Sequence, residues 1–302
     1  MKNTYNYILI VLSVLVIYSC SKDPRTEKIE TVKKANIIKV EDNLNISFLL
    51  DLSDRIDPKK YPNPAMEYYV RDAEYIKSVI GGFDNLLRAK KVRSMDDKIQ
   101  LYFEPEPLNQ EINNLSHNLK FQINKNNVSM KLLKKIVDAY STQPIEIYNL
   151  AIKDDKYVGS DIWKFFKNKV EHYCIEEDYR NILVILTDGY IYHKDSKQKA
   201  KNLTTYLTPQ DIRDFRLTSP DWKEKIEKEG FGFIPATDDL SNLEILVLGI
   251  NPDKKSPYEE DIIKTYWKNW FTAMKVKRFQ MLNADLPSNL DKIIKDFILL
   301  NK

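Results

Sequence analysis

The sequence predicts an α/β fold built around a mostly parallel sheet. Two short runs carry this prediction, residues 46–50 (ISFLL) and 182–186 (ILVIL). Both runs are almost continuously apolar and contain β-branched residues, as expected of parallel strands buried on both faces. Asp51 directly follows the first run, and Asp188 follows the second run after Thr187. Because ligands of open α/β sheets bind outside the carboxyl ends of the strands, we expect these two residues to mark a binding site.

The N-terminal region is predicted to direct export. Residues 7–17 form a largely apolar stretch that is shorter than the roughly 20 residues of a spanning helix, which favours a cleaved signal over a membrane anchor. Ser19 and Cys20 resemble the processing site of bacterial lipoproteins, which implies a signal peptide over 1–19 and lipid on Cys20. An ordinary signal peptide or a single anchor helix is the alternative. Residues 20–42 are polar and are expected to form a flexible tether.

Lipid on Cys20 would hold the chain in the bacterial cell envelope without a spanning segment. Ser21 favours the outer membrane, and the sequence leaves open whether the domain faces the periplasm or the cell surface. Cys174 is the other cysteine of the chain. With Cys20 lipidated it would have no disulfide partner, so we expect a small buried core residue.

The remaining elements follow along residues 43–302. Helices are expected where apolar positions recur at helical spacing, and strands where short apolar runs end at turn residues. We expect helices over 64–89, 130–140, 160–176, 258–274 and 290–300, and strands over 98–103, 243–250 and 278–282. Residues 145–152 are a further apolar piece that we expect to be strand-like. The aromatic stripe of the helix over 258–274 is expected in the core.

The ordered motifs resemble the von Willebrand factor type A family. Its metal-ion-dependent adhesion site combines a D-x-S-x-S loop after the first strand, a threonine in a central loop and an aspartate after the fourth strand. Asp51 and Ser53 match the first loop, Ser160 stands in place of the threonine, and Asp188 matches the last position. The resemblance covers about residues 45–300. It implies a doubly wound sheet with helices on both faces and one antiparallel edge strand, over 119–123.

The resemblance also implies a Mg²⁺ or Mn²⁺ site with an open coordination position. Ser53 and Ser160 would be direct ligands, and Asp51 and Asp188 would bind directly or through water, with Thr187 beside them. In the family, an acidic residue of a protein partner completes the metal's coordination, so the metal bridges two proteins.

Arg55 departs from the motif because it stands where the family has its second serine. A guanidinium is always protonated and repels a nearby dication. Two arrangements are open: Arg55 points away and Asp54 supplies the lost ligand, or Arg55 pairs with Asp51 or Asp188 and makes a metal-free cleft.

Residues 190–229 form an insertion, since plain connections have about 2 to 6 residues. It begins with Tyr190, Tyr192 and His193, continues with lysines, and contains a helix start at Thr208. We expect either part of a partner-binding surface that favours acidic partners or a solvated hairpin. The three histidines lack the spacing of zinc ligands.

Composition and motifs restrict the function. The 47 basic and 44 acidic side chains give a net charge of +3 without a basic block, which argues against nucleic-acid binding. No G-x-S-x-G, H-E-x-x-H or phosphate-loop motif is present. We therefore expect a membrane-tethered binding module without enzymatic activity. The alternatives are a metal-assisted hydrolase or phosphoryl-transfer enzyme and a metal-free scaffold domain.

Overall fold

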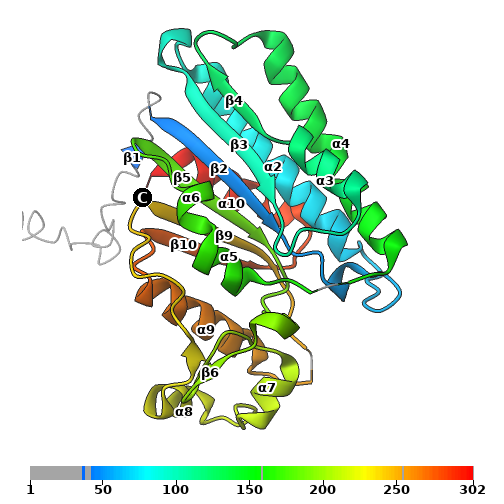
Figure 1. Cartoon of the computed structure of the whole chain (residues 1–302), viewed down its shortest axis with the longest axis vertical. Coiled ribbons are helices and arrows are strands. Elements are labelled where there is room, and N and C mark those ends of the chain that lie inside the picture. Colours follow the sequence, from blue (N-terminus) through cyan, green and yellow to red (C-terminus); the bar gives the residue numbers. More distant parts are fainter. Residues whose placement is uncertain (1–35, 38–41, 158, 254, 302) are drawn as a thin grey trace, which may run out of the picture. The chain divides into compact units, whose positions relative to one another are not determined.

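A six-stranded sheet organises the chain (Figure 1). The computed structural model describes residues 36–37, 42–157, 159–253 and 255–301, so the predicted signal peptide, Cys20 and nearly all of the predicted tether lie outside them. The sheet has the order β10-β9-β5-β2-β3-β4. Its strands are β2 (Asn43–Leu50), β3 (Asp96–Tyr102), β4 (Phe121–Asn124), β5 (Tyr179–Leu186), β9 (Leu243–Ile250) and β10 (Arg278–Asn283). All neighbours are parallel except β4, which runs antiparallel to β3. The predicted mostly parallel sheet and its antiparallel edge strand are confirmed.

The two strands that end at aspartates are neighbours at the centre of this sheet. β2 pairs with β5 in parallel, with Leu50 opposite Leu186. The ladder continues one step further, because the Asp51 N–H donates to the Leu186 carbonyl at 3.0 Å. Asp51 and Asp188 therefore emerge at the same edge of the sheet, as the two apolar runs predict.

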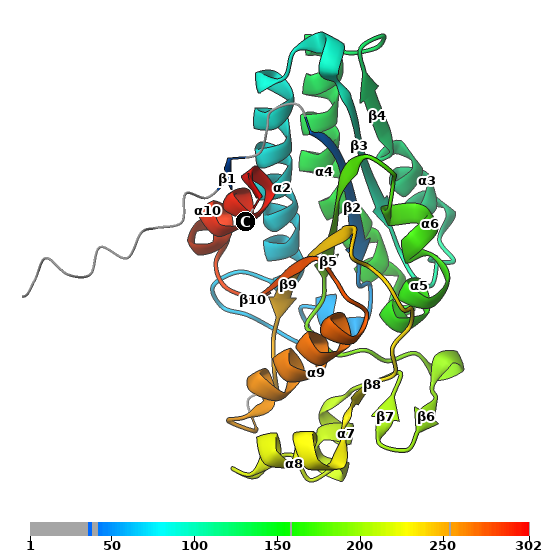
Figure 2. The ribbon, with the colours of Figure 1, turned by 90° about the vertical axis from the view of Figure 1, so that its left-hand side faces the viewer.

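Helices cover both faces of the sheet, so the predicted doubly wound arrangement is confirmed (Figure 2). One core lies beneath α2 (Tyr68–Ala89), α4 (Met130–Asp154) and α10 (Pro287–Leu299). The other lies beneath α5 (Ile162–Asn168), α6 (Val170–Cys174) and α9 (Glu259–Ala273). The aromatic stripe of α9 is buried in this second core, and so is Cys174. Both expectations are confirmed.

The remaining elements are short. They are β1 (Asn36–Ile37), β11 (Leu300–Asn301), α3 (Gln110–Asn118), β6 (Lys199–Ala200), β7 (Leu203–Thr204), α7 (Pro209–Asp214), α8 (Trp222–Glu229), β8 (Gly232–Phe233) and the 3-10 turns η1 (Asp54–Ile56), η2 (Val92–Ser94) and η3 (Lys194–Ser196). Within and just after residues 190–229, β6, β7 and β8 form a small three-stranded sheet. Thr208 and Asp211 form a capping box at α7, at the predicted helix start.

Residues 145–152 are helical, so the expected strand-like piece is wrong. They form the second half of α4, which continues through Pro144. The buried positions of α4 recur at helical spacing and run on past the proline; they are Leu133, Ile136, Ala139, Tyr140, Pro144, Ile147 and Tyr148. A short apolar run allows either assignment from its composition, and the continuous buried stripe favours the helix.

Two further differences concern helices. Residues 160–176 form two helices, α5 and α6, because the backbone at Lys169 leaves the helical region with φ −126°. Tyr173 in α6 is 44% exposed. The sequence also gave no indication of α3, which has only Ile112 and Ser116 buried.

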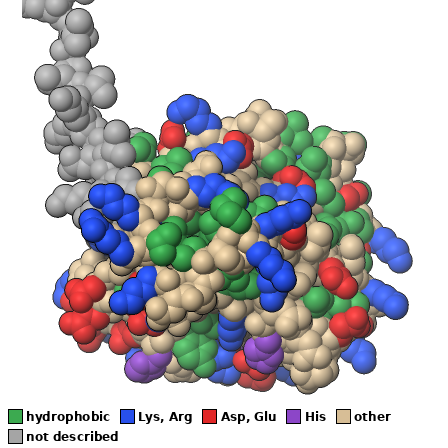
Figure 3. Space-filling view, turned by 90° about the horizontal axis from the view of Figure 1, so that it is seen from above, with side chains coloured by type: hydrophobic (Ala, Val, Ile, Leu, Met, Phe, Trp, Pro, Cys, Tyr) green, Lys and Arg blue, Asp and Glu red, His purple; other side chains and the backbone are tan. Residues whose placement is uncertain are grey.

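Charged side chains are dispersed over the surface. On the face seen in Figure 3, Lys and Arg side chains are interspersed with acidic and apolar ones, without a single basic block. None of the helices in the described ranges is both long enough and apolar enough to cross a membrane.

Candidate functional site

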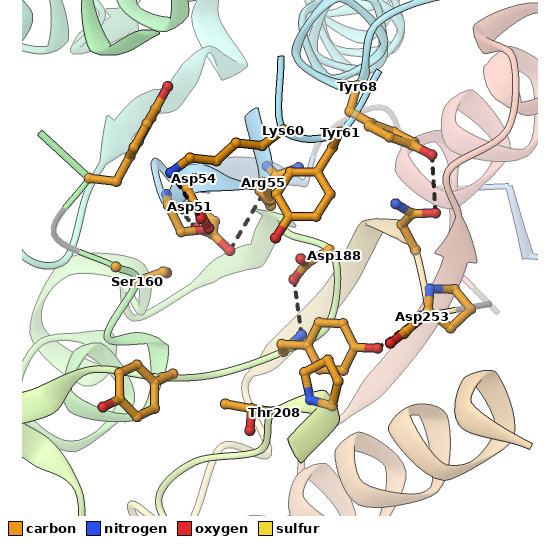
Figure 4. A pocket seen from close by; sticks show the side chains of 18 of the residues that line it. Asp51, Asp54, Arg55, Lys60, Tyr61, Tyr68, Ser160, Asp188, Thr208 and Asp253 are labelled. Carbon is orange, nitrogen blue, oxygen red and sulfur yellow. Dashed lines mark hydrogen bonds and ion pairs between the residues drawn. The ribbon is translucent and has the colours of Figure 1, made fainter. Parts of the chain in front are cut away.

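A cleft of about 1120 Å³ lies at the carboxyl ends of β2 and β5. Figure 4 shows several of its side chains. The cleft brings together eight of the predicted site residues, namely Asp51, Ser53, Asp54, Arg55, Ser160, Asp188, Tyr190 and Tyr192. Thr187 is buried beneath the cleft, and His193 lies beside the Ser160 loop rather than on the cleft wall. The structure therefore assembles positions that are up to 141 residues apart (192 − 51).

Asp51 is held firmly at the floor of the cleft. Its side chain is only 2% exposed. Oδ1 accepts the Ser53 N–H at 2.8 Å, and Oδ2 accepts the Thr187 hydroxyl at 2.8 Å. Both oxygens thus have donors from the loops after β2 and β5, which restricts Asp51 to one orientation.

Arg55 lies against this aspartate, and its side chain is only 6% exposed. Its Nε is 3.5 Å from Oδ2 of Asp51. Its Nη2 donates to Oδ2 of Asp72 at 2.6 Å and to the Leu186 carbonyl at 2.9 Å. Burial alone would lower the pKa of Arg55, but the charges of Asp72 and Asp51 outweigh it and raise the pKa above its ordinary value. The guanidinium therefore stays charged between two carboxylates.

Asp72 is the site residue that sequence reasoning missed. It comes from α2, is 1% exposed, and also accepts the Tyr148 hydroxyl from α4 at 3.1 Å. A signal was present in the sequence, because Asp72 stands three residues after Tyr69 and four before Ile76, at the helical spacing of the apolar stripe. A carboxylate on a buried helical face needs a partner, and here the partner is Arg55.

Asp54 points to the rim and does not replace the missing hydroxyl ligand. Its Oδ2 lies 3.3 Å from Nζ of Lys60, and both side chains are about half exposed. Figure 4 shows this pair above Asp51. Of the two predicted arrangements, the geometry is closer to the one in which Arg55 pairs with Asp51. The shorter contact of Arg55, however, is with Asp72.

Asp188 differs from Asp51 in lacking a cationic partner. Its Oδ1 accepts the Tyr190 N–H at 3.1 Å, and no Lys or Arg within the described ranges forms an ion pair with it. Burial raises the pKa of Asp188 to about 7, the charge of Asp51 adds to this, and Arg55 opposes it only in part. Oδ2 accepts no hydrogen bond from a described residue and is not sealed from solvent. This oxygen is available to a ligand.

The Ser160 loop is tied to the start of the insertion. Ser160 forms a β-bridge with Tyr192, and the space above Gly159 is taken by the Tyr192 carbonyl, which would lie 2.8 Å from an added Cβ. Asp161 caps α5 through the Lys164 N–H at 3.0 Å and accepts the Ser196 hydroxyl. These contacts place Tyr192 on the cleft wall.

The residues present do not fit the divalent metal that the family resemblance implies. A dication bound about 2 Å from Oδ2 of Asp51 would lie within about 6 Å of the guanidinium charge, a repulsion on the order of 6 kcal/mol at an effective dielectric of about 20. Arg55 also neutralises part of the negative charge that would attract the ion. The two hydroxyls and Asp188 remain as oxygen donors, and among the described residues no group of three or more His, Cys, Asp or Glu side chains is arranged so that it could hold a metal ion. Metal binding by the natural chain stays a prediction that requires measurement.

Comparisons with known proteins give distant structural likenesses. No protein-family model matches the chain, and no curated protein matches it. An aerotolerance-related membrane protein from Bacteroides fragilis is 10% identical, with 85% of this chain and 98% of that chain covered and a TM-score of 0.36. The protein BatB from Bacteroides thetaiotaomicron is 11% identical, with 85% and 97% covered and a TM-score of 0.35. The pilus adhesin SpaC from Lactobacillus rhamnosus GG is 10% identical, with 85% and 30% covered and a TM-score of 0.40. The fold described above stands on the sheet order and register of this chain.

Proposed function

We propose that this chain is an exported binding module that recognises a protein partner at the carboxyl edge of its central sheet. The observation that carries the proposal is the cleft itself, which gathers Asp51, Ser53, Ser160 and Asp188 from three separate loops. In doubly wound folds this edge is the usual place for ligands. The order of the motifs resembles that of von Willebrand factor type A domains, in which the same edge binds proteins.

The tether is part of the proposal. A lipid on Cys20 and a polar segment over 20–42 would hold the domain at the envelope membrane while leaving the cleft free. A membrane-tethered module that binds a second protein needs no catalytic group, only a surface of defined shape and charge.

The side chains of the cleft support binding rather than catalysis. No histidine or cysteine lies among the described residues that line it. Nearby, the Ser196 hydroxyl donates to Asp161 rather than to His193, so these residues do not form a nucleophile and base pair. The hydroxyls of Ser53 and Ser160 likewise have no general base hydrogen-bonded to them among the described residues.

Site-specific photocrosslinking in intact cells tests this function. Benzoylphenylalanine would replace Tyr61 or Tyr192, which line the cleft and are 46% and 44% exposed. Tyr173 is the matched control, because it is also 44% exposed but lies outside the cleft. We expect discrete protein adducts at Tyr61 and Tyr192 and none of the same mass at Tyr173.

Two outcomes would contradict the proposal. Adducts of identical mass from all three positions would indicate nonspecific proximity at the membrane. No adduct from either cleft position, with normal yields of the labelled protein, would exclude a protein partner at this edge under the growth condition used.

A further inference from the structure

The charge balance of the cleft floor differs from that of a metal site. Two carboxylates around a dication would leave no net charge, and an open metal position attracts an acidic ligand. Here Asp51, Asp72 and Asp188 surround one guanidinium, that of Arg55. Counted as ionised groups, three negative charges and one positive charge give the floor a net charge of −2. Because the pKa of Asp188 is about 7, this group carries about half of its charge at neutral pH, and the floor stays negative. A floor of this sign attracts a cation and repels a carboxylate.

The excess negative charge is concentrated on Asp188. Asp72 and Asp51 both lie within ion-pair distance of Arg55, at 2.6 and 3.5 Å, whereas Asp188 has no such partner among the described residues. One of its oxygens remains open to the cleft. The nearby hydroxyls of Ser53 and Ser160 accept no hydrogen bond within the described part of the chain and also line the cleft. They could accept the remaining N–H groups of an ammonium or guanidinium.

The cleft walls also suit an ammonium or guanidinium group. Five tyrosines line it, and two of their rings already hold ammonium groups of this chain, with Lys60 4.9 Å from the Tyr157 ring and Lys197 5.8 Å from the Tyr192 ring. Tyr61 is exposed and has no such cation over its ring among the described residues. Figure 4 shows Tyr61 beside Asp188. An aromatic ring next to an open carboxylate is a common arrangement for binding a basic side chain.

We propose that Asp188 and Tyr61 receive a lysine or arginine side chain of the partner, and that Arg55 replaces the metal and thereby reverses the charge that the cleft prefers. This inference rests on the proposed function and names the chemistry of the partner at the same site. It differs from the acidic partner that the family resemblance implies. The carboxylate of Asp188 accepts the cation directly, and the ring of Tyr61 covers its apolar stem.

Saturation-transfer NMR on the full chain in detergent tests the preference. The probes are the N-acetyl methylamides of lysine, arginine and glutamate at equal concentration, so that only the side-chain charge differs. We expect transfer to the two basic probes and little to the acidic one. Asp188→Asn should weaken binding of the basic probes about tenfold, as expected for loss of one charged hydrogen-bond acceptor. Tyr61→Leu should weaken it about threefold through loss of the cation–π contact.

Asp296→Asn is the matched control, because Asp296 lies outside the cleft, is 42% exposed and forms an ion pair with Lys292. It should leave the affinity for the basic probes within about twofold, as for a solvent-exposed ion pair. Equal binding of the glutamate probe, or an affinity for the basic probes that Asp188→Asn leaves unchanged, would overturn the proposal. Failure of the NMR test would not contradict the proposed function, because a cleft that does not prefer basic side chains would still give protein adducts in the crosslinking experiment if it binds a partner.

The role of Arg55 has its own test. Mn²⁺ titrations by calorimetry should show no binding to the natural chain and binding to Arg55→Ser, with Asp188→Ala abolishing it in that background. Because Arg55→Ser leaves Asp72 unpaired in the core, the double variant Arg55→Ser/Asp72→Asn is measured in parallel. With Mn²⁺ bound, the preference should change to the glutamate probe. Comparable Mn²⁺ binding by the natural chain, or failure of both serine variants to bind although folded, would overturn the assigned role of Arg55.

Discussion

Arg55 and Asp72 form a buried ion pair with a distance of 2.6 Å between Nη2 and Oδ2, and they join the loop after β2 to α2. Neither side chain is more than 6% exposed. The same guanidinium reaches the Leu186 carbonyl at the end of β5. One side chain therefore fixes three elements around the cleft floor, and the geometry of Asp51 depends on it.

Arg55→Met should destabilise the protein strongly. The substitution keeps the apolar stem but leaves Asp72 and Asp51 without their cation, and removing one partner of a buried pair costs about 3 to 5 kcal/mol. Urea unfolding followed by circular dichroism measures this free energy. The double variant Arg55→Met/Asp72→Asn should recover much of the loss.

Arg88→Met provides the control for that measurement. Arg88 also contacts an aspartate at 2.6 Å, but its side chain is 40% exposed. Loss of an exposed pair should cost less than about 1 kcal/mol. Equal losses in Arg55→Met and Arg88→Met would show that burial of the Arg55 pair has no energetic consequence.

Asp188 should make stability fall as the pH rises through neutrality. The pKa of its carboxyl is about 7 in the folded chain and 3.8 ordinarily, so between these values the folded state binds more protons than the unfolded state. The free energy of unfolding then decreases with pH over this range. A pKa difference of this size corresponds to roughly 4 kcal/mol.

Asp188→Asn removes this group from the pH profile. Thermal and urea unfolding of both proteins at about pH 5 and about pH 8 should show a smaller loss of stability in the variant. Parallel pH profiles would mean that Asp188 titrates as it does in the unfolded chain.

Gly189 is required by the close approach of the loop after β5 to α9. Its φ is +98°, and an added Cβ would lie 2.7 Å from Cγ2 of Ile263. Gly189→Ala should therefore cost about 2 to 4 kcal/mol, from left-handed strain and overpacking together. Gly230→Ala is the matched control, because Gly230 also has a positive φ but has no atom within 4 Å of the added Cβ. It should cost about 1 kcal/mol, and denaturant unfolding gives both values.

Cys20→Ala should prevent lipid attachment. Radioactive or clickable palmitate should label the natural chain and not the variant, and the variant should leave the membrane fraction or retain its signal peptide. A natural chain that takes up no label would refute the predicted lipoprotein.

The cleft shows where sequence reasoning was sufficient. Asp51 and Asp188 each come after a short apolar run that contains β-branched residues, which favours a buried strand, and parallel neighbours present their ends at one edge. The parallel sheet and the edge at which its polar loops meet follow from that local pattern, whereas the helices on both faces and the gathering of Ser53 and Ser160 were implied by the family resemblance. Residues 145–152 were misassigned for the opposite reason, because a short apolar run has no period that separates a strand from a buried helix.

The sequence by itself determined the parallel strands and the edge at which the polar loops meet, because strand burial is encoded locally, and the family resemblance supplied the antiparallel edge strand. Only the tertiary structure decided how the charges pair. Arg55 contacts Asp51, as one of the two predicted arrangements has it. Its shorter contact is with Asp72, which is 17 residues away on a helix packed against the sheet. Ion pairs between elements depend on distances of a few ångströms across packed surfaces, and residue spacing along the chain does not specify such distances.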